Sequence, residues 1–527
     1  MTAPIALEVF RHLLASVAEE MGGRLQRSAF SPNIKERRDF SCAVFNDRGL
    51  LIAHAAHIPV HLGAMPLSVQ ACLQAVSLDP GDMAIVNNPY QGGTHLPDMT
   101  LVAPVFSSNA DSRTLVGFVA NRAHHADVGG MSPGSMPLSR EVFQEGLVVP
   151  PVMLVRGGQV DRDLWNILLA NVRTPAERAG DLLAQIAANQ IGIARLQAIV
   201  ARFGDVHVRD AMTRLCAYAE RMVRQFIAEL PDGTWRFEDR LDDDGISLHP
   251  VRLVVTITVH GDEMIIDFQG TDAQRAGNIN AVFAITLSAI AYVLQCLVGD
   301  DLPANSGCLA PIRVVAPEGT VVNARAPAAV AGGNVETAQR IVDVLLGALA
   351  QVCPSRIPAA SQGTMNNVTV GGWDPIRQRA FAYYETLGGG MGAGEGWDGA
   401  SAIHSHMTNT LNTPVEALEY AYPLRVTRYA IRRGSGGCGR WRGGDGLSRE
   451  LEFLHDAQVT ILSDRRQTQP YGLAGGRPGQ QGRNVLIRRQ EEQVLPGKVS
   501  LTVQAKDRLR IDTPGGGGYG LSRNTDV

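Results

Sequence analysis

The chain has 527 residues, of which 45% are apolar and 19% charged, and its formal net charge is −4. This balance excludes a disordered chain, and without a basic excess a nucleic-acid partner is not expected. Glycine provides 56 residues, about one in ten, without the three-residue period of collagen. The length corresponds to roughly three domains or one large composite body with a sizeable core.

The N-terminal part combines a helix with short strands. Apolar residues recur at helical spacing over 5–21 and predict a first helix. Short β-like runs follow at 42–45 and 83–86, and two more lie within 101–119. This pattern predicts a region of mixed strands and loops.

A helical hairpin is predicted in the middle of the chain. Thr174-Pro175-Ala176-Glu177 has the pattern of a capping box with proline at the first helical position. The helix it opens runs to about residue 203, where Gly204 ends it, and a second helix covers about 207–230. Two long helices with a short connection form a hairpin, for which a structural role is sufficient.

The C-terminal half is predicted to be rich in strands and glycine turns. A β-hairpin is expected from 251–259 and 264–269, followed by helices at 281–298 and near 335–352. The 18 residues of 281–298 carry no charge, yet acidic residues follow and no basic flank does, so a buried helix rather than a membrane span is expected. From 363 onward, short strands alternate with glycine turns, most densely at 388–396.

These elements predict an α+β fold, in which a large mixed body has a central helical hairpin and a β- and glycine-rich C-terminal half. We divide the chain into 1–170, a region of mixed strands and loops, 171–232, the helical hairpin, and 233–527, the β-rich region with apolar core helices.

The cysteines indicate the cellular compartment, and the lysines indicate whether this chain binds ATP. The seven cysteines form no CxxC pair and are odd in number, which is typical of reduced thiols in a cytoplasmic protein. The first residues lack the pattern of a signal peptide. Lysine occurs only at Lys35, Lys498 and Lys506, and none is followed by Ser or Thr. The chain therefore has no phosphate-binding loop of the GxxxxGK[ST] type, and any ATP is expected to bind another polypeptide.

Histidines concentrate in the N-terminal part, where six of the 13 lie between positions 54 and 125. The segments Thr94-His95-Leu96-Pro97-Asp98 and His124-His125-Ala126-Asp127 combine imidazoles with carboxylates, which are the ligands of zinc, manganese or iron. The His95-x-x-Asp98 spacing allows one turn to direct both side chains at one ion. A single such pair also arises by chance. A metal site is favoured because six histidines are concentrated here, with aspartates, beside glycine and proline loops.

Three further histidines and the glycine cluster have less specific signals. His54, His57 and His61 are spaced as on one helix face, but Pro59 interrupts a helix there, so we expect a loop that borders a pocket. For at least one of them, a structural role is the simpler interpretation. The glycines of 388–396 lack the lysine of a phosphate loop and instead predict close backbone approach to a ligand or a neighbouring subunit.

Several segments together resemble the hydantoinase B family. They are Ser31-Pro32-Asn33-Ile34-Lys35-Glu36-Arg37-Arg38-Asp39-Phe40-Ser41, His57-Ile58-Pro59-Val60-His61-Leu62-Gly63, Asn87-Asn88-Pro89-Tyr90, Gly93-Thr94-His95-Leu96-Pro97-Asp98, His124-His125-Ala126-Asp127-Val128-Gly129-Gly130 and Thr513-Pro514-Gly515-Gly516-Gly517-Gly518-Tyr519-Gly520. The resemblance covers almost the whole chain. The family includes the B subunit of ATP-dependent N-methylhydantoinase, the C-terminal part of 5-oxoprolinase, and the alpha subunits of acetone and acetophenone carboxylases.

The resemblance implies a metal site and a division of labour between two subunits. A hydantoinase A-type partner would bind ATP and Mg and phosphorylate a carbonyl oxygen, while this chain would complete the hydrolysis of a small cyclic amide, as part of a hetero-oligomer. The matching motifs imply a divalent transition metal (Zn, Mn or Fe) with the ligands Asp39, His95, Asp98 and His124. Next in line are His125 and Asp127, and the expected general base is His125, His57 or His61.

Two other functions are compatible with the sequence. The alpha subunit of an ATP-dependent ketone carboxylase would use the same kind of metal site to join an enolate to activated bicarbonate. A non-catalytic scaffold would only bind the ATPase partner, and substitutions of its histidines and aspartates would leave turnover unchanged.

Overall fold

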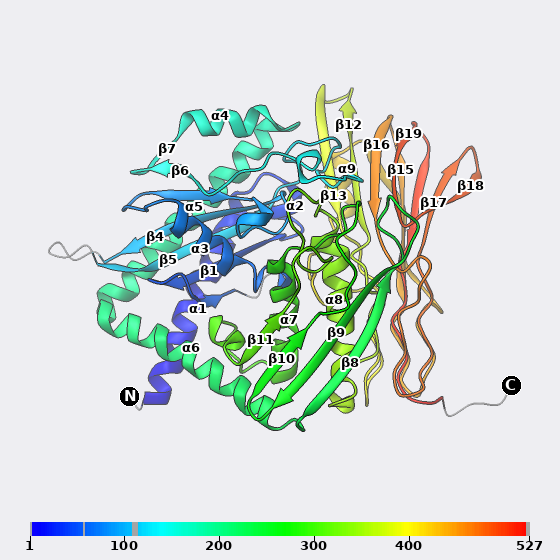
Figure 1. Ribbon diagram of the computed structural model, residues 1–527. Coiled ribbons are helices and arrows are strands. Elements are labelled where there is room, and N and C mark those ends of the chain that lie inside the picture. The colour runs from blue at the N-terminus through cyan, green and yellow to red at the C-terminus, as the bar shows by residue number, and fades with distance from the viewer. Residues whose placement is uncertain (1–2, 56–57, 108–113, 523–527) are drawn as a thin grey trace.

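The computed structural model describes residues 3–55, 58–107 and 114–522. In Figure 1, the N-terminal sheet lies at one side, the C-terminal sheets lie at the other, and α7 and α8 lie between them. Helices and sheets occupy separate layers, so the predicted α+β class is confirmed. Among the described residues, no helix combines the length and apolarity required to span a bilayer.

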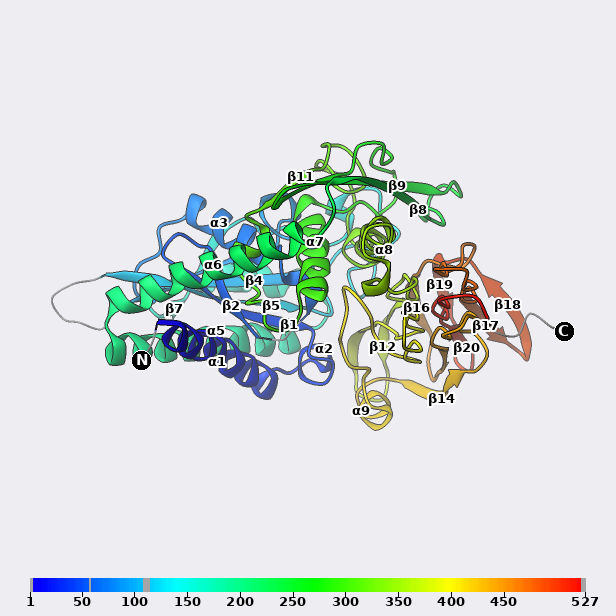
Figure 2. The ribbon, with the colours of Figure 1, turned by 90° about the horizontal axis from the view of Figure 1, so that it is seen from below.

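The first part is a seven-stranded antiparallel sheet in the order β2-β1-β5-β4-β3-β6-β7. Figure 2 shows α1 and α5 on one face of this sheet and α3 on the other. Because both faces are covered, β1 is buried along its whole length. The elements of this part are α1 (Ala3–Ser28), α2 (Pro32–Lys35), β1 (Phe40–Asn46), β2 (Leu51–His54), α3 (Met65–Ala75), β3 (Met83–Val86), β4 (Asp98–Phe106), β5 (Leu115–His124), β6 (Val152–Arg156), β7 (Gln159–Val160), α4 (Arg162–Ala170), α5 (Pro175–Phe203) and α6 (Asp205–Ala228).

The predicted pair of long helices is present as α5 and α6, separated by Gly204 alone, which has a φ of +81°. The predicted capping box is wrong in its detail. The Thr174 side chain makes no capping hydrogen bond, and the Glu177 carboxylate forms an ion pair with Arg178 instead of returning to the Thr174 backbone. A neighbouring guanidinium thus competes successfully for the carboxylate that a capping box requires.

The middle part carries a four-stranded sheet in the order β11-β10-β9-β8 and the two apolar helices. The predicted hairpin is confirmed as β9 paired with β10, and the uncharged segment is confirmed as the buried helix α7. A π-helical turn at Gly333–Thr337 leads directly into α8. The elements are β8 (Gly233–Leu241), β9 (Val251–His260), β10 (Glu263–Asp267), α7 (Phe283–Val298), β11 (Ile312–Val315) and α8 (Ala338–Leu349).

The C-terminal part is a pair of antiparallel sheets in the orders β13-β12-β16-β19 and β14-β15-β20-β17-β18, which share a hydrophobic core with α9. Its elements are β12 (Asn367–Asp374), β13 (Arg379–Glu385), α9 (Val415–Ala421), β14 (Leu424–Arg432), β15 (Gly446–Phe453), β16 (Ala457–Leu462), β17 (Arg483–Arg488), β18 (Glu491–Leu495), β19 (Lys498–Val503) and β20 (Arg508–Asp512). A larger core joins residues from all three predicted segments, whose boundaries at 170 and 232 stay a prediction.

The glycine clusters approach the chain's own backbone. Gly390 donates its N–H to the Pro514 carbonyl, Gly516 donates to Gly444, and Gly517 donates to Ala360. A Cβ atom on Gly390 would lie 2.0 Å from the Gly444 oxygen and 2.2 Å from the Gly516 nitrogen. Glycine is therefore required by close packing of extended segments of this chain with one another.

We predict that Gly390→Ala lowers the free energy of unfolding by about 2–3 kcal/mol, because both clashing atoms belong to the backbone and cannot rotate away. The control is Gly23→Ala in α1, where the Cβ would meet only the Arg27 side chain at 3.6 Å. That change is expected to be neutral or to stabilise by up to about 1 kcal/mol. Urea unfolding measures both, and equal stabilities of the two variants would contradict the prediction.

Candidate metal centre

Three predicted ligands lie in one row across neighbouring strands at one end of the seven-stranded sheet. Asp98, the first residue of β4, is paired with His124, the last residue of β5. On the other side of β5, the pair Phe40–Ala123 places Asp39 beside His124, whose N–H donates to the Asp39 carbonyl at 3.0 Å. Because side chains alternate along strands, this register directs Asp39, His124 and Asp98 to the same face.

His95 completes a triangle with two of these residues. Its Nε2 lies 3.2 Å from Asp98 Oδ1 and 3.2 Å from His124 Nδ1, and the third side, from His124 Nδ1 to Asp98 Oδ1, is 3.3 Å. Ligands about 2.0–2.1 Å from a tetrahedral zinc ion lie about 3.3–3.4 Å apart. The three atoms thus have the spacing of ligands on one side of a divalent ion, so these residues fit the implied metal.

The turn that carries His95 is held in place by backbone contacts. Asp98 donates its N–H to the His95 carbonyl at 3.1 Å, and His125 donates to the Pro97 carbonyl at 2.8 Å. Before this turn, Gly92 has a φ of +86°, and a Cβ there would lie 2.4 Å from the Leu67 oxygen. The side chains of His95 and Asp98 thus converge from one turn, with 3.2 Å between His95 Nε2 and Asp98 Oδ1.

Asp98 is a buried carboxylate surrounded by hydrogen-bond donors. Its Oδ2 accepts from Thr94 Oγ1 at 2.6 Å and lies 3.4 Å from His61 Nε2. Burial opposes its ionisation, but contacts with His95, His124 and His61 outweigh burial and hold the pKa of Asp98 well below its usual range. Asp98 is therefore held as an ionised carboxylate, which is the form that binds a metal ion.

The imidazole of His124 is kept neutral, which is the form that binds a metal ion. Burial lowers its pKa, and the nearby carboxylates of Asp39 and Asp98 offset this only in part. Its ring stacks on Tyr384, with the centroids 4.5 Å apart and the planes at 13°. The Arg37 guanidinium lies over the Tyr384 ring at 4.9 Å, and Asn33 Nδ2 donates to the His124 carbonyl at 2.6 Å. These contacts restrict the orientation of the imidazole.

Two groups at this centre were not predicted from the sequence. Tyr384 comes from β13, and Asn334 comes from the π-helical turn, where its Nδ2 lies 3.1 Å from His95 Nε2. Both are far from the histidines in sequence, so no local spacing identifies them. The only signal for Asn334 in the sequence was a polar amide within an apolar segment. The structure places this amide in a π-helical turn, and such turns recur at functional sites.

The remaining predicted residues lie elsewhere. His125 follows His124 directly beyond the end of β5, and its Nε2 lies 2.9 Å from Gln185 Oε1 of α5. Asp127 forms an ion pair with Arg173 at 2.8 Å. Asp39 is separated from Asp98 by the width of β5 and does not join the triangle. His57 lies outside the described residues.

His61 lies in a 3-10 turn, Pro59–His61, and its Nδ1 is 2.8 Å from Ser41 Oγ. With its Nε2 at Asp98, both ring nitrogens have partners. His61 therefore connects β1 to the triangle, while His54 contacts the carbonyl of Ala55. The two histidines line the same small cavity, but His54 is the last residue of strand β2, so the expected loop is wrong for this residue.

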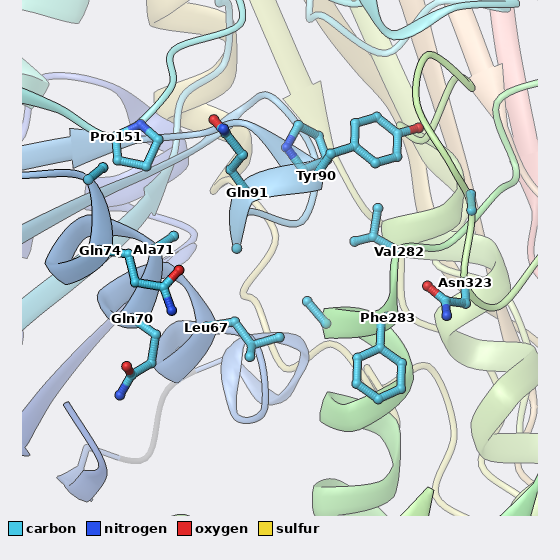
Figure 3. A pocket seen from close by; sticks show the side chains of 15 residues that line it. Leu67, Gln70, Ala71, Gln74, Tyr90, Gln91, Pro151, Val282, Phe283 and Asn323 are labelled. Atoms are coloured by element: carbon cyan, nitrogen blue, oxygen red, sulfur yellow. The ribbon is translucent and has the colours of Figure 1, made fainter. Parts of the chain in front are cut away.

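The pocket in Figure 3 is a separate cavity of about 550 Å³ between α3, the turn at Pro89–Gln91 and the start of α7. Its described lining consists of uncharged side chains, among them Gln70, Tyr90 and Phe283. No residue of the triangle belongs to that described lining. The described lining thus offers contacts for a neutral surface and contains no carboxylate, imidazole or thiol.

Comparison with known proteins identifies the family. A sequence model described as "Hydantoinase B/oxoprolinase" matches residues 3–522. The chain belongs to the hydantoinase B/oxoprolinase family. Within this family, it is 41% identical to 5-oxoprolinase 1 of Arabidopsis thaliana over 98% of its own length, but it spans only 42% of that relative. It is 33% identical to the B subunit of a putative D-/L-hydantoinase of Pseudomonas sp., over 98% of this chain and 90% of that relative.

Solved structures agree with this assignment. The crystal structure of an ATP-dependent caprolactamase from Pseudomonas jessenii superposes with a TM-score of 0.90 at 29% identity, covering 99% of this chain and 91% of that one. Hydantoinase B/oxoprolinase members thus occur both as separate chains of this length and as parts of longer chains.

We predict that His124→Ala lowers the affinity for Zn²⁺ or Mn²⁺ by about 100-fold or more, because one side of the triangle is lost. The neighbouring His125→Ala is the matched control and should keep the wild-type affinity, since its ring faces α5. Competition with a chelator of known affinity measures both. Loss of metal from His125→Ala with retention in His124→Ala would reverse the assignment.

Proposed function

We propose that this chain is the metal-dependent component of an ATP-dependent cyclic amidohydrolase that opens a lactam or imide ring, such as a hydantoin or 5-oxoproline. The triangle of His95, Asp98 and His124 is the observation that carries the proposal. The names of the relatives, a 5-oxoprolinase and a hydantoinase, and of the structural neighbour, an ATP-dependent caprolactamase, support the substrate class.

The proposed reaction uses ATP because an amide carbonyl is a poor electrophile. An A-type partner, with its own ATP and Mg, transfers the γ-phosphoryl group to the amide oxygen and forms ADP. Water adds to the activated carbon, the ring C–N bond breaks, and the nitrogen takes a proton. A second water then hydrolyses the acyl phosphate to the carboxylate and inorganic phosphate. The lack of a lysine-containing phosphate loop in this chain supports the assignment of ATP to the partner.

The residues of this chain prepare the site for the hydrolytic steps. Asp98 stays ionised and His124 stays neutral, so both keep the lone pairs that a divalent ion needs. When bound, such an ion acts as a Lewis acid and provides hydroxide near neutral pH. Thr94 and His61 hold the second carboxylate oxygen of Asp98 and so orient the first. The role of general base, which the family resemblance implies for His125, His57 or His61, stays a prediction, as does Asp39 as a further ligand.

We predict that Asp98→Asn reduces ATP-dependent ring opening at least about 100-fold, because the neutral amide cannot replace the ionised ligand. The chain is purified with its ATPase partner, and hydantoin, 2-pyrrolidone and 5-oxoproline are supplied with ATP. Mass spectrometry of the opened product gives the rate. The control is Asp374→Asn, a buried aspartate that pairs with Arg377 at the end of β12 and should leave the rate unchanged.

The same complex separates the alternatives. Incorporation of labelled bicarbonate into a carboxylate product from a ketone, without ring opening, would contradict the proposal and indicate a carboxylase. Unchanged turnover in Asp98→Asn would indicate a scaffold that only binds the ATPase partner.

A further inference from the structure

A second group of buried polar side chains lies where α8 meets the loop at 404–406. Gln339 of α8 donates from its Nε2 to the Ser405 carbonyl at 3.0 Å. Its Oε1 is buried and has no hydrogen-bond partner within the described part of the chain. Since its amide nitrogen is already used, Gln339 presents an acceptor. We call Gln339, Ser405 and His406 the amide cluster.

His406 presents a second unpaired group in the same place. The residue is only 7% exposed, and its Nδ1 lies 3.3 Å from the Tyr292 hydroxyl of α7. Its Nε2 and the Ser405 hydroxyl are both buried without a partner among the described residues. In the tautomer whose Nδ1 accepts from the Tyr292 hydroxyl, the imidazole carries its hydrogen on Nε2 and presents a donor there.

The backbone at His406 is also unusual. Its φ is +57°, in the left-handed region that residues other than glycine rarely adopt. Such conformations persist where the surrounding structure imposes them, and they concentrate at binding and catalytic sites. Buried polar atoms nearly always have partners. The amide cluster contains three unpaired ones, Gln339 Oε1, Ser405 Oγ and His406 Nε2, and they require a common explanation.

The amide cluster is connected to the metal centre through one helix. Asn334 contacts His95 from the π-helical turn, and Gln339 follows five residues later at the start of α8. Asn334 lies within the π-helical turn Gly333–Thr337, and Gln339 is the second residue of α8, which follows that turn directly. The Oδ1 of Asn334 is likewise buried without a partner in the described structure. Two side chains with unpaired polar atoms therefore lie on one helical segment, Asn334 at the metal centre and Gln339 in the amide cluster.

We propose that the amide cluster binds the ring of an uncharged cyclic amide, with Gln339 Oε1 accepting from the ring N–H and His406 Nε2 donating to the adjacent C=O. A ring forces its amide into the cis form, which places these two groups side by side. The inference rests on the proposed function for the identity of the ring. Burial lowers the pKa of His406, only partly offset by Asp343, so a neutral imidazole faces a neutral ligand.

The test uses the full-length, metal-loaded chain and two probes, 2-pyrrolidone and N-methyl-2-pyrrolidone, measured by calorimetry. Gln339→Leu removes the acceptor, and we expect it to weaken 2-pyrrolidone binding about tenfold or more. N-methylation of the probe should weaken its binding to the wild type by the same factor. It should not weaken binding to Gln339→Leu any further. His406→Asn tolerates the left-handed backbone, removes Nε2, and should weaken both probes.

Gln351→Leu is the matched control, because Gln351 also donates to a backbone carbonyl, that of Arg236, but lies beyond the far end of α8. It should bind both probes like the wild type, and all variants should bind one metal ion per chain. The binding proposal for the amide cluster is overturned if both cluster variants bind the probes like the wild type. It is also overturned if the wild type hydrolyses cyclic amides but does not bind 2-pyrrolidone. Both outcomes leave the proposed function intact. Cluster-dependent binding without any ATP-dependent ring opening supports the cluster and overturns the proposed function.

Discussion

The site depends on one buried carboxylate, that of Asp98, which contacts imidazoles from three different segments. His95 comes from the preceding turn, His124 from the paired strand, and His61 from a 3-10 turn. An ionised carboxylate is stable in a protein interior only when donors or opposite charges surround it closely. This requirement constrains the position of each segment, and the same geometry produces three atoms with the spacing of metal ligands.

The centre is a junction of the three parts of the molecule. The seven-stranded sheet contributes the triangle, the π-helical turn before α8 contributes Asn334, and β13 contributes Tyr384. Buried ion pairs hold α8 at this junction: Arg340 contacts Asp239 of β8 at 2.8 Å and Asp464 of the C-terminal part at 3.0 Å. Charges buried this deeply stabilise one arrangement of the parts because a displaced partner would leave an uncompensated charge.

Local patterns in the sequence predicted more of the elements than of their contacts. The strands, the long helices and the His95–Asp98 turn depend on neighbouring residues, and they are present. The directions of His124 and His125 could not be predicted locally, since the two imidazoles are adjacent in the sequence. The pairing of β5 with β4 places His124 beside Asp98, while the ring of His125 contacts Gln185 of α5.

The sequence by itself determined the family, the clustering of imidazoles and carboxylates, the lack of a lysine-containing phosphate loop and the positions of the glycine clusters. Only the tertiary structure decided which residues contact those site residues and glycines. Asn334 lies 239 residues from His95, and Gly390 packs on Gly516, so neither contact leaves a local pattern. For the same reason, the sequence did not predict Gln339 and His406. A polar side chain is identified as unpaired only when every atom around it has been placed.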